Sequence, residues 1–264
     1  MKSCFDKVNW HADVAGLVAS EDSKVTAQRL VSLICSTVAN NGTGLLAFHK
    51  DAPPEVLHHS LAPMPERHYL DRYLAGPYLL DPLYQLALSD EKPSMCRFRD
   101  TTPDRFHSSE YFRQYRERTH LVDEMDFLLG ISPVTTVVMV VGRMEKRFTR
   151  YELNRLRLIE PIIRSAMQKV WDGISGNRSR DAGDYGMHQR LTACFENFGE
   201  ATLTQREREI TQLLLRGHSS KSIARVLGIA PGTVMVHKRN LFGKLGITSQ
   251  FQLFSRFIDA LSES

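Results

Sequence analysis

The sequence has no long apolar run, which excludes a membrane-spanning helix of ordinary length. No segment approaches the roughly 20 apolar residues that such a helix needs. The first residues, MKSCFDKVNWHADV, contain no apolar signal core either. Cysteine is scarce, and Cys4, Cys35, Cys96 and Cys194 form no C-x-x-C pair, which favours free thiols over disulfides or a thiolate metal site. We therefore expect a cytoplasmic protein without structural zinc.

Motifs of enzyme chemistry are also missing. Residues 1–202 contain no Gly-rich phosphate loop, no nucleophile elbow, and no histidines and carboxylates at metal-ligand spacing. The adjacent His58 and His59 would point to opposite faces of a strand, so they make a poor metal pair. We expect no catalytic residue, no metal site, no cofactor and no enzymatic activity.

Positive charge is concentrated at one end of a chain that is otherwise balanced. The 264 residues carry a formal net charge of +4. From Leu203 onward, 9 Lys and Arg stand against 4 Asp and Glu, whereas residues 1–202 hold 25 basic and 26 acidic side chains. A small basic module behind a neutral body is typical of a nucleic-acid-binding protein. A solvated basic face would have the same composition, so the residue pattern has to decide.

A polar stretch with four glycines, residues 172–186, separates two regions of different pattern and is expected to be an interdomain linker. Residues 191–199 would form a short helix or extension before the second domain. We therefore expect a domain over 1–171, a linker over 172–202 and a second domain over 203–264.

The first domain alternates between helical and strand periodicity. The expected helices are 24–39, 66–75, 81–88, 108–118 and one from Thr149 to about Trp171. The expected strands are 43–50, 55–62, 124–131 and 135–143, the last two forming a hairpin. This order predicts an α+β fold, an α-β-α sandwich. The order resembles that of the GAF/PAS-like ligand-sensing folds.

The second domain shows the start and stop signals of four helices. Thr204 and Glu207 have the spacing of a capping box, and Gly217 ends the first helix. Ser219 or Ser220 would cap the second helix, and Pro231 suits the first position of the third. The residues expected to be buried are Ile210, Leu213, Leu214, Ile223, Ala224, Leu227, Val234, Leu241 and Leu245. Two short helices across a tight turn, the second one basic, form a helix-turn-helix.

This pattern resembles the LuxR-type DNA-binding domain over roughly residues 203–262. The matching residues are Leu203-Thr204, Arg206-Glu207, Gly217, Ile223-Ala224, Leu227-Gly228, Thr233-Val234, His237 and Lys244-Leu245. The resemblance implies an all-α four-helix domain whose third helix enters the major groove of double-stranded DNA. A generic small helical bundle, with Lys238 and Arg239 on a wet face, is the alternative.

The resemblance also assigns DNA contacts. Met235, Val236 and Arg239 occupy the base-reading positions, and Met235 stands where the family usually has lysine. We expect apolar contact with a thymine methyl group at Met235 and Val236, and a charged contact at Arg239. Met235 could instead pack inward. The residues expected to hold phosphates are Lys221, Thr233, Lys238 and Lys244.

The last helix, expected from Ser249, carries several large apolar residues: Phe251, Phe254, Phe257, Ile258 and Leu261. In the family this helix pairs with its counterpart in a second subunit. A homodimer on a palindromic operator, with half-sites about one helical turn apart, is implied. The alternative is that all of these side chains face the interior of one subunit.

Three functions are considered for the first domain. A phosphorylated receiver is set aside because a helix comes first and no strand ends in a suitable Asp. In the second hypothesis, residues 68–84 resemble the acyl-homoserine-lactone-binding domain of quorum-sensing regulators, with Tyr69, Tyr73 and Asp81 as ligand-binding residues. Aromatic faces would hold an acyl chain, and the carboxylate would accept the ligand amide N–H. The two tyrosines could equally form an ordinary amphipathic stripe.

In the third hypothesis the first domain binds no small molecule and serves dimerisation or protein contact. The acidic run Asp123-Glu124-Met125-Asp126 is expected to be solvated or to cap a helix, although one carboxylate in a pocket would favour a cationic ligand. The combined expectation is a ligand-responsive transcriptional regulator of LuxR type. An enzyme with a DNA-binding tail is the other class.

Overall fold

The computed structural model describes residue 5 and the ranges 8–61, 69–175 and 182–262, and these form two compact units. The first unit comprises residues 1–64, 86–101 and 120–181, and the second comprises 65–85, 102–119 and 182–264. Among the helices that the structure describes, none is both long and apolar enough to span a bilayer.

The centre of the first unit is a five-stranded antiparallel sheet in the order β2-β1-β5-β4-β3. Its strands are β1 (Gly42–His49), β2 (Glu55–Leu61), β3 (Met95–Arg97), β4 (Asp123–Ser132) and β5 (Thr135–Arg143). The expected hairpin is present, because β4 and β5 are joined by a short turn and pair Phe127 with Met139. The three-residue β3 was not expected, since so short a strand has no detectable period.

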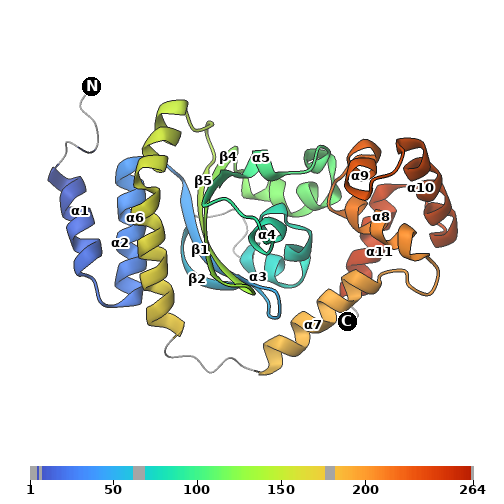
Figure 1. Ribbon diagram of the computed structural model, residues 1–264, viewed down its shortest axis with the longest axis horizontal. Coiled ribbons are helices and arrows are strands. Elements are labelled where there is room, and N and C mark those ends of the chain that lie inside the picture. The colour runs from blue at the N-terminus through green and yellow to red at the C-terminus, as the bar shows by residue number, and fades with distance from the viewer. Residues whose placement is uncertain (1–4, 6–7, 62–68, 176–181, 263–264) are drawn as a thin grey trace. The chain divides into compact units, whose positions relative to one another are not determined.

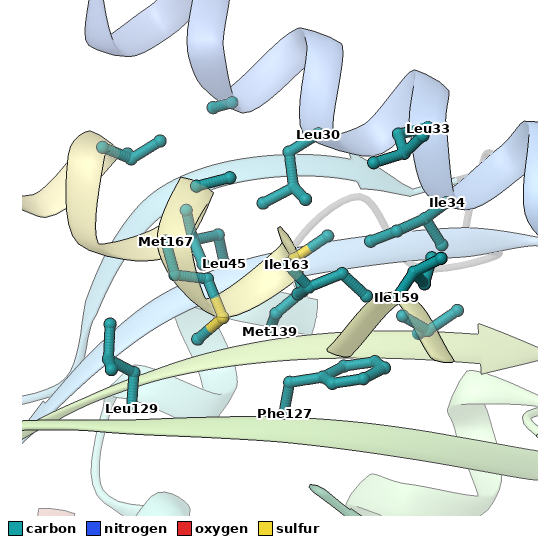
Figure 2. Close-up of a cluster of buried hydrophobic side chains, with 14 of the residues drawn as sticks. Leu30, Leu33, Ile34, Leu45, Phe127, Leu129, Met139, Ile159, Ile163 and Met167 are labelled. Carbon is teal, nitrogen blue, oxygen red and sulfur yellow. The ribbon is translucent and has the colours of Figure 1, made fainter. Parts of the chain in front are cut away.

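Two helices, α2 (Ser23–Thr37) and α6 (Arg150–Ser175), cover one face of this sheet (Figure 1). The helix α1 (Val8–Ala19) packs against α2, which also contacts α6. Apolar residues of α2 and α6, such as Leu30 and Ile163, meet those of the strands, such as Leu45 and Phe127, in the main core (Figure 2). The short α5 (Phe98–Thr101) contacts β4. The expected α+β class with helices against an antiparallel sheet is confirmed.

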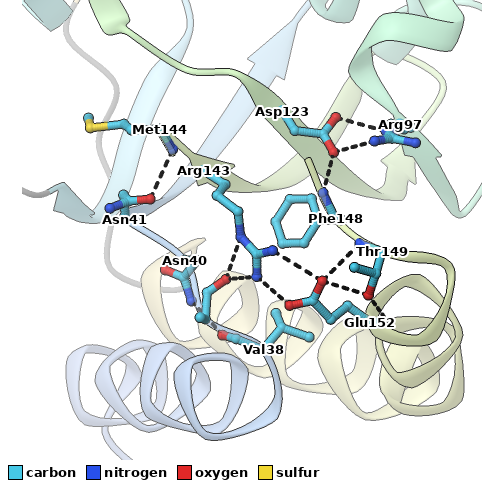
Figure 3. Close-up of polar contacts among 11 residues, drawn as sticks. Val38, Asn40, Asn41, Arg97, Asp123, Arg143, Met144, Phe148, Thr149 and Glu152 are labelled. Atoms are coloured by element: carbon cyan, nitrogen blue, oxygen red, sulfur yellow. Dashed lines mark hydrogen bonds and ion pairs between the residues drawn. The ribbon is translucent and has the colours of Figure 1, made fainter. Parts of the chain in front are cut away.

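A buried arginine connects β5, α6 and the end of α2 (Figure 3). Arg143, 2% exposed, donates to both carboxylate oxygens of Glu152 at 3.1 and 2.8 Å, and to the carbonyl oxygen of Ala39. Its guanidinium also lies 4.2 Å from the centre of the Phe148 ring. The Arg143 hydrogen bonds lower the pKa of Glu152 to about 2 despite the opposing effect of burial.

The expectation that the acidic run is solvated or caps a helix was wrong. Asp123, Glu124 and Asp126 are 5%, 2% and 0% exposed. Asp123 accepts hydrogen bonds from the Arg97 guanidinium, at 2.8 Å for Nε, and from the Phe148 backbone N–H at 2.7 Å. Because Arg97 is 26 positions away in the chain, local sequence could not reveal this partner.

The second unit contains α7 (Ala182–Asn197), α8 (Gln205–Leu215), α9 (Ser220–Leu227), α10 (Pro231–Leu245) and α11 (Gln250–Ser262). It also includes α3 (Tyr69–Leu74), η2 (Pro77–Leu80) and the turns η3 (Phe106–Ser108), η4 (Phe112–Arg116) and η5 (Glu117–Thr119). The helix α4 (Pro82–Ala87) begins in this unit, and its last two residues are assigned to the first unit. Residues 108–118 are therefore a series of 3-10 and π turns, not the expected α-helix.

The expected linker is shorter than its composition suggested. Of residues 172–186, those up to Ser175 continue α6 and those from Ala182 begin α7, while 176–181 lie outside the described residues. The expected domain boundaries at residues 171 and 203 remain a prediction. By contacts, residues 65–85 and 102–119 group with the C-terminal helices.

Replacing Glu152 with glutamine should lower the free energy of unfolding by about 2 kcal/mol at neutral pH, because the buried Arg143 guanidinium loses its charged partner. The folded-state pKa of Glu152 lies below its ordinary value of 4.5, so its contribution is complete above that pH and is lost as pH falls toward about 2. Urea denaturation of both proteins across this range measures the difference.

Glu145→Gln is the matched control, since it removes the same charge from an exposed position in the loop after β5. It should leave the unfolding free energy within about 0.5 kcal/mol of the wild type. A stability deficit in E152Q that persists unchanged at pH 2 would contradict the assigned role of the carboxylate.

Candidate nucleic-acid interface

The capping box predicted at the start of α8 is confirmed. Thr204 Oγ1 accepts from the Glu207 backbone N–H at 3.3 Å, and Glu207 Oε2 accepts from the Thr204 N–H at 2.8 Å. Glu207 is 3% exposed and also accepts from Lys244 Nζ at 2.7 Å. Burial works to raise the pKa of Glu207, but the hydrogen bonds from Lys244 and Thr204 outweigh it and lower the pKa. An ionised carboxylate therefore joins the start of α8 to the end of α10.

The helix-turn-helix consists of α9 and α10. Ser219, rather than Ser220, is the N-cap of α9 and accepts from the Ser222 N–H at 3.1 Å. Gly228 ends the helix with φ of +64°, a conformation that favours glycine. Pro231 follows at the first position of α10, after Ala230, which offers no side-chain cap. The chain thus turns sharply between two helices that contact each other.

One face of α10 is exposed and carries the three expected base-reading side chains. Met235 is 64% exposed and Val236 47%, so Met235 points away from the interior. Arg239 is exposed one turn further along the same face. The opposite side of the helix is anchored by the buried residues Val234, Leu241 and Leu245.

The expected phosphate-contacting residues divide into two groups. Lys221 and Thr233 are exposed near the first turns of α9 and α10. Lys238 is half-buried with Nζ 5.4 Å from the centre of the Phe242 ring, and its pKa is lowered by burial and then by the charge of Arg105. Lys244 forms an ion pair with Glu207, so it also has a structural role.

The last helix hides most of its apolar residues. Leu253, Phe254, Phe257 and Leu261 are buried, whereas Phe251 is 55% exposed. One large aromatic side chain on α11 therefore faces outward.

The structure brings together two of the three expected ligand-binding residues. The Tyr73 hydroxyl donates to Asp81 Oδ2 at 3.0 Å, and Asp81 Oδ1 accepts from the Leu83 N–H at 2.9 Å. Both side chains are buried, at 5% and 8% exposure. Tyr69 begins α3, but its side chain lies outside the described residues.

Sequence reasoning missed a second buried pair in this unit. The Tyr78 hydroxyl lies 2.8 Å from His188 Nδ1, and the two rings are stacked. Burial raises the pKa of Tyr78, so its hydroxyl stays protonated. The two residues are 110 positions apart, and neither belongs to a recognisable motif.

Residues 201–257 match the family described as "Bacterial regulatory proteins, luxR family". An HTH-type transcriptional regulator from the exeN 3' region of Aeromonas salmonicida is 30% identical over 157 residues, which are 58% of this chain and 80% of that protein. The chain therefore belongs to the LuxR-type family of bacterial regulatory proteins, and its C-terminal module is the helix-turn-helix DNA-binding domain of that family.

Two further similarities concern separate parts of the chain. The transcriptional regulatory protein UhpA of Escherichia coli is 44% identical over 57 residues, which are 22% of this chain and 29% of UhpA. The crystal structure of the VqsR LBD domain from Pseudomonas aeruginosa has a TM-score of 0.56 at 22% identity, covering 63% of this chain and 99% of that one. The second similarity concerns the fold of the N-terminal part alone.

Replacing Lys244 with methionine should lower the free energy of unfolding of the C-terminal helices by about 1 kcal/mol, because the buried Glu207 carboxylate loses its cation. Lys221→Met, at an exposed position on α9, is the control and should leave stability unchanged. Denaturation followed by circular dichroism makes the comparison. Equal stability of both variants would show that the ion pair with Glu207 has no structural weight.

Proposed function

We propose that this protein is a sequence-specific DNA-binding transcriptional regulator that responds to a small molecule bound by its N-terminal part. The observation that carries the DNA-binding proposal is the exposed face of α10, with Met235, Val236 and Arg239 held outward by buried residues on the other side. In a helix-turn-helix, such a face enters the major groove while the first helix crosses the backbone.

The side chains would divide the work by their chemistry. Arg239 can donate to a guanine edge, and Met235 and Val236 offer apolar contact to a thymine methyl group. Lys221, Thr233, Lys238 and Lys244 would contact phosphates and fix the register on the duplex. For Lys244 this contact would share the ammonium group with Glu207, because its side chain is still 39% exposed.

A homodimer on a palindromic operator belongs to the same proposal. The exposed Phe251 side chain on α11 supports it, since an outward aromatic residue on a short helix is suited to an interface. Two copies related by a two-fold axis would present their α10 helices to half-sites about one helical turn apart.

The proposed effector is a small molecule with an apolar portion and a hydrogen-bond donor. The buried Tyr73 and Asp81 support it, because a phenol ring and a carboxylate offer apolar and polar recognition at one place. The similarity of fold to the VqsR LBD domain adds support. The second candidate, a dimerisation or protein-contact module without a ligand, would use the same sheet and helices.

Arg239→Ala should cost about 1–3 kcal/mol in binding to an operator selected from random sequences by the wild-type chain. The variant should also lose its sequence preference at one base pair of the operator, because Arg239 no longer reads that pair. Fluorescence anisotropy with single-base operator variants measures this. Arg225→Ala, an exposed arginine on α9, is the control for the same change of charge. Equal weakening on every sequence would make Arg239 a phosphate contact.

The effector can be sought by mass spectrometry of small molecules that co-purify with the intact chain. Adding the identified compound should change the DNA affinity of the wild type, and Asp81→Asn should reduce this response about tenfold by removing the carboxylate charge. The amide that replaces the carboxylate keeps an acceptor for the Leu83 N–H. Asp71→Asn, at an exposed position of α3, is the control. No bound molecule, with DNA affinity unchanged by every extract, would favour the protein-contact module.

A further inference from the structure

The segment around Asp104, which lies 115 positions before Ser219, docks on the DNA-binding domain within the second unit. The backbone N–H of Arg105 donates to the carbonyl oxygen of Gly217 at 3.0 Å, and the Phe106 side chain is 1% exposed. Gly217 has φ of +90°, and a Cβ atom there would lie 3.0 Å from Phe106 Cα. The residue at position 217 must therefore be glycine both for its backbone conformation and for this close approach.

The carboxylate of Asp104 binds the N-terminal end of α9. Its Oδ1 accepts from the Ser219 backbone N–H at 2.9 Å, and its Oδ2 accepts from the Ser219 hydroxyl. Burial works to raise the pKa of Asp104, but the two hydrogen bonds from Ser219 outweigh it and lower the pKa. A negative charge therefore rests at the start of the first helix of the helix-turn-helix.

The same position is where a helix-turn-helix meets the DNA backbone. The first helix crosses the sugar-phosphate chain, and backbone N–H groups at helix N-termini bind phosphate oxygens. Lys221, one of the expected phosphate-contacting residues, is exposed in the first turn of α9. An anion is thus already bound where a DNA phosphate would approach.

We propose that Asp104 is an autoinhibitory residue, a carboxylate that occupies the phosphate-contacting end of α9 and weakens DNA binding by the full chain. This inference rests on the proposed DNA-binding function. The base-reading side chains Met235 and Arg239 stay exposed. Asp104 therefore competes with contacts to the DNA phosphates and leaves the base-reading face of α10 open. Displacement of the segment 102–109 from Gly217 and Ser219 would remove the competing charge.

The test compares the full-length wild type with Asp104→Asn on a duplex of mixed sequence, since backbone contacts do not depend on sequence. The substituted side chain keeps the size and one acceptor of the aspartate but lacks its charge. The variant should bind about fivefold more tightly, with a salt dependence steeper by about one phosphate contact. Asp100→Asn, on a side chain that is 69% exposed, removes the same charge without touching α9 and should bind like the wild type.

Affinity of D104N equal to or weaker than that of D100N would overturn the proposal, because the docked segment would then be compatible with DNA. If wild type and both variants all fail to bind the duplex even at low salt, the DNA-binding function itself fails. Salt-dependent binding that is identical in the wild type, D104N and D100N would contradict the autoinhibition by Asp104 but not the DNA-binding function.

Hydrogen exchange of the unaltered chain provides a second test that needs no variant. Backbone amides of residues 102–109 should exchange faster when the duplex is added, because the incoming phosphate displaces Asp104 from Ser219. Unchanged or slower exchange in this segment on DNA binding would overturn the proposal.

Discussion

The Oε2 atom of Glu207 accepts hydrogen bonds from the Thr204 N–H, the Thr204 hydroxyl and the Lys244 ammonium group. These contacts link the first turn of α8 to the last turn of α10. The orientation of α10, and with it the direction of its exposed face, depends on this buried carboxylate together with the apolar residues beneath it. A short four-helix module has a small apolar core. The three hydrogen bonds to the Glu207 carboxylate therefore contribute strongly to fixing how its helices are oriented.

The helix-turn-helix could be predicted closely because its signals are local. A capping box spans four residues, and Gly217 and Gly228 stand where φ is positive. Four of the five strands of the antiparallel sheet were also visible, since each spans seven or more residues, whereas the three-residue β3 was not. Residues 108–118 were misjudged because an apolar period at helical spacing does not distinguish α from π or 3-10 turns.

The polar contacts that could not be predicted depend on partners far along the chain. Asp123 was expected to be solvated or to cap a helix, yet it is buried and accepts hydrogen bonds from Arg97 and from the Phe148 N–H. Tyr78 meets His188, and Asp104 meets Ser219, across 110 and 115 positions. Tyr73 and Asp81 were chosen by resemblance, and the structure brings them into contact at 3.0 Å.

In the proposed DNA contacts, Met235 places an apolar side chain at the centre of the base-reading face of α10. The C5-methyl group of thymine is also present in 5-methylcytosine, and both project into the major groove at the same place. A Met235 that is 64% exposed on α10 therefore offers the same contact to either base. Methylation of a cytosine at the position that Met235 is proposed to contact would supply the methyl group that this side chain meets, and the flexible thioether would adapt to it without a change in the backbone.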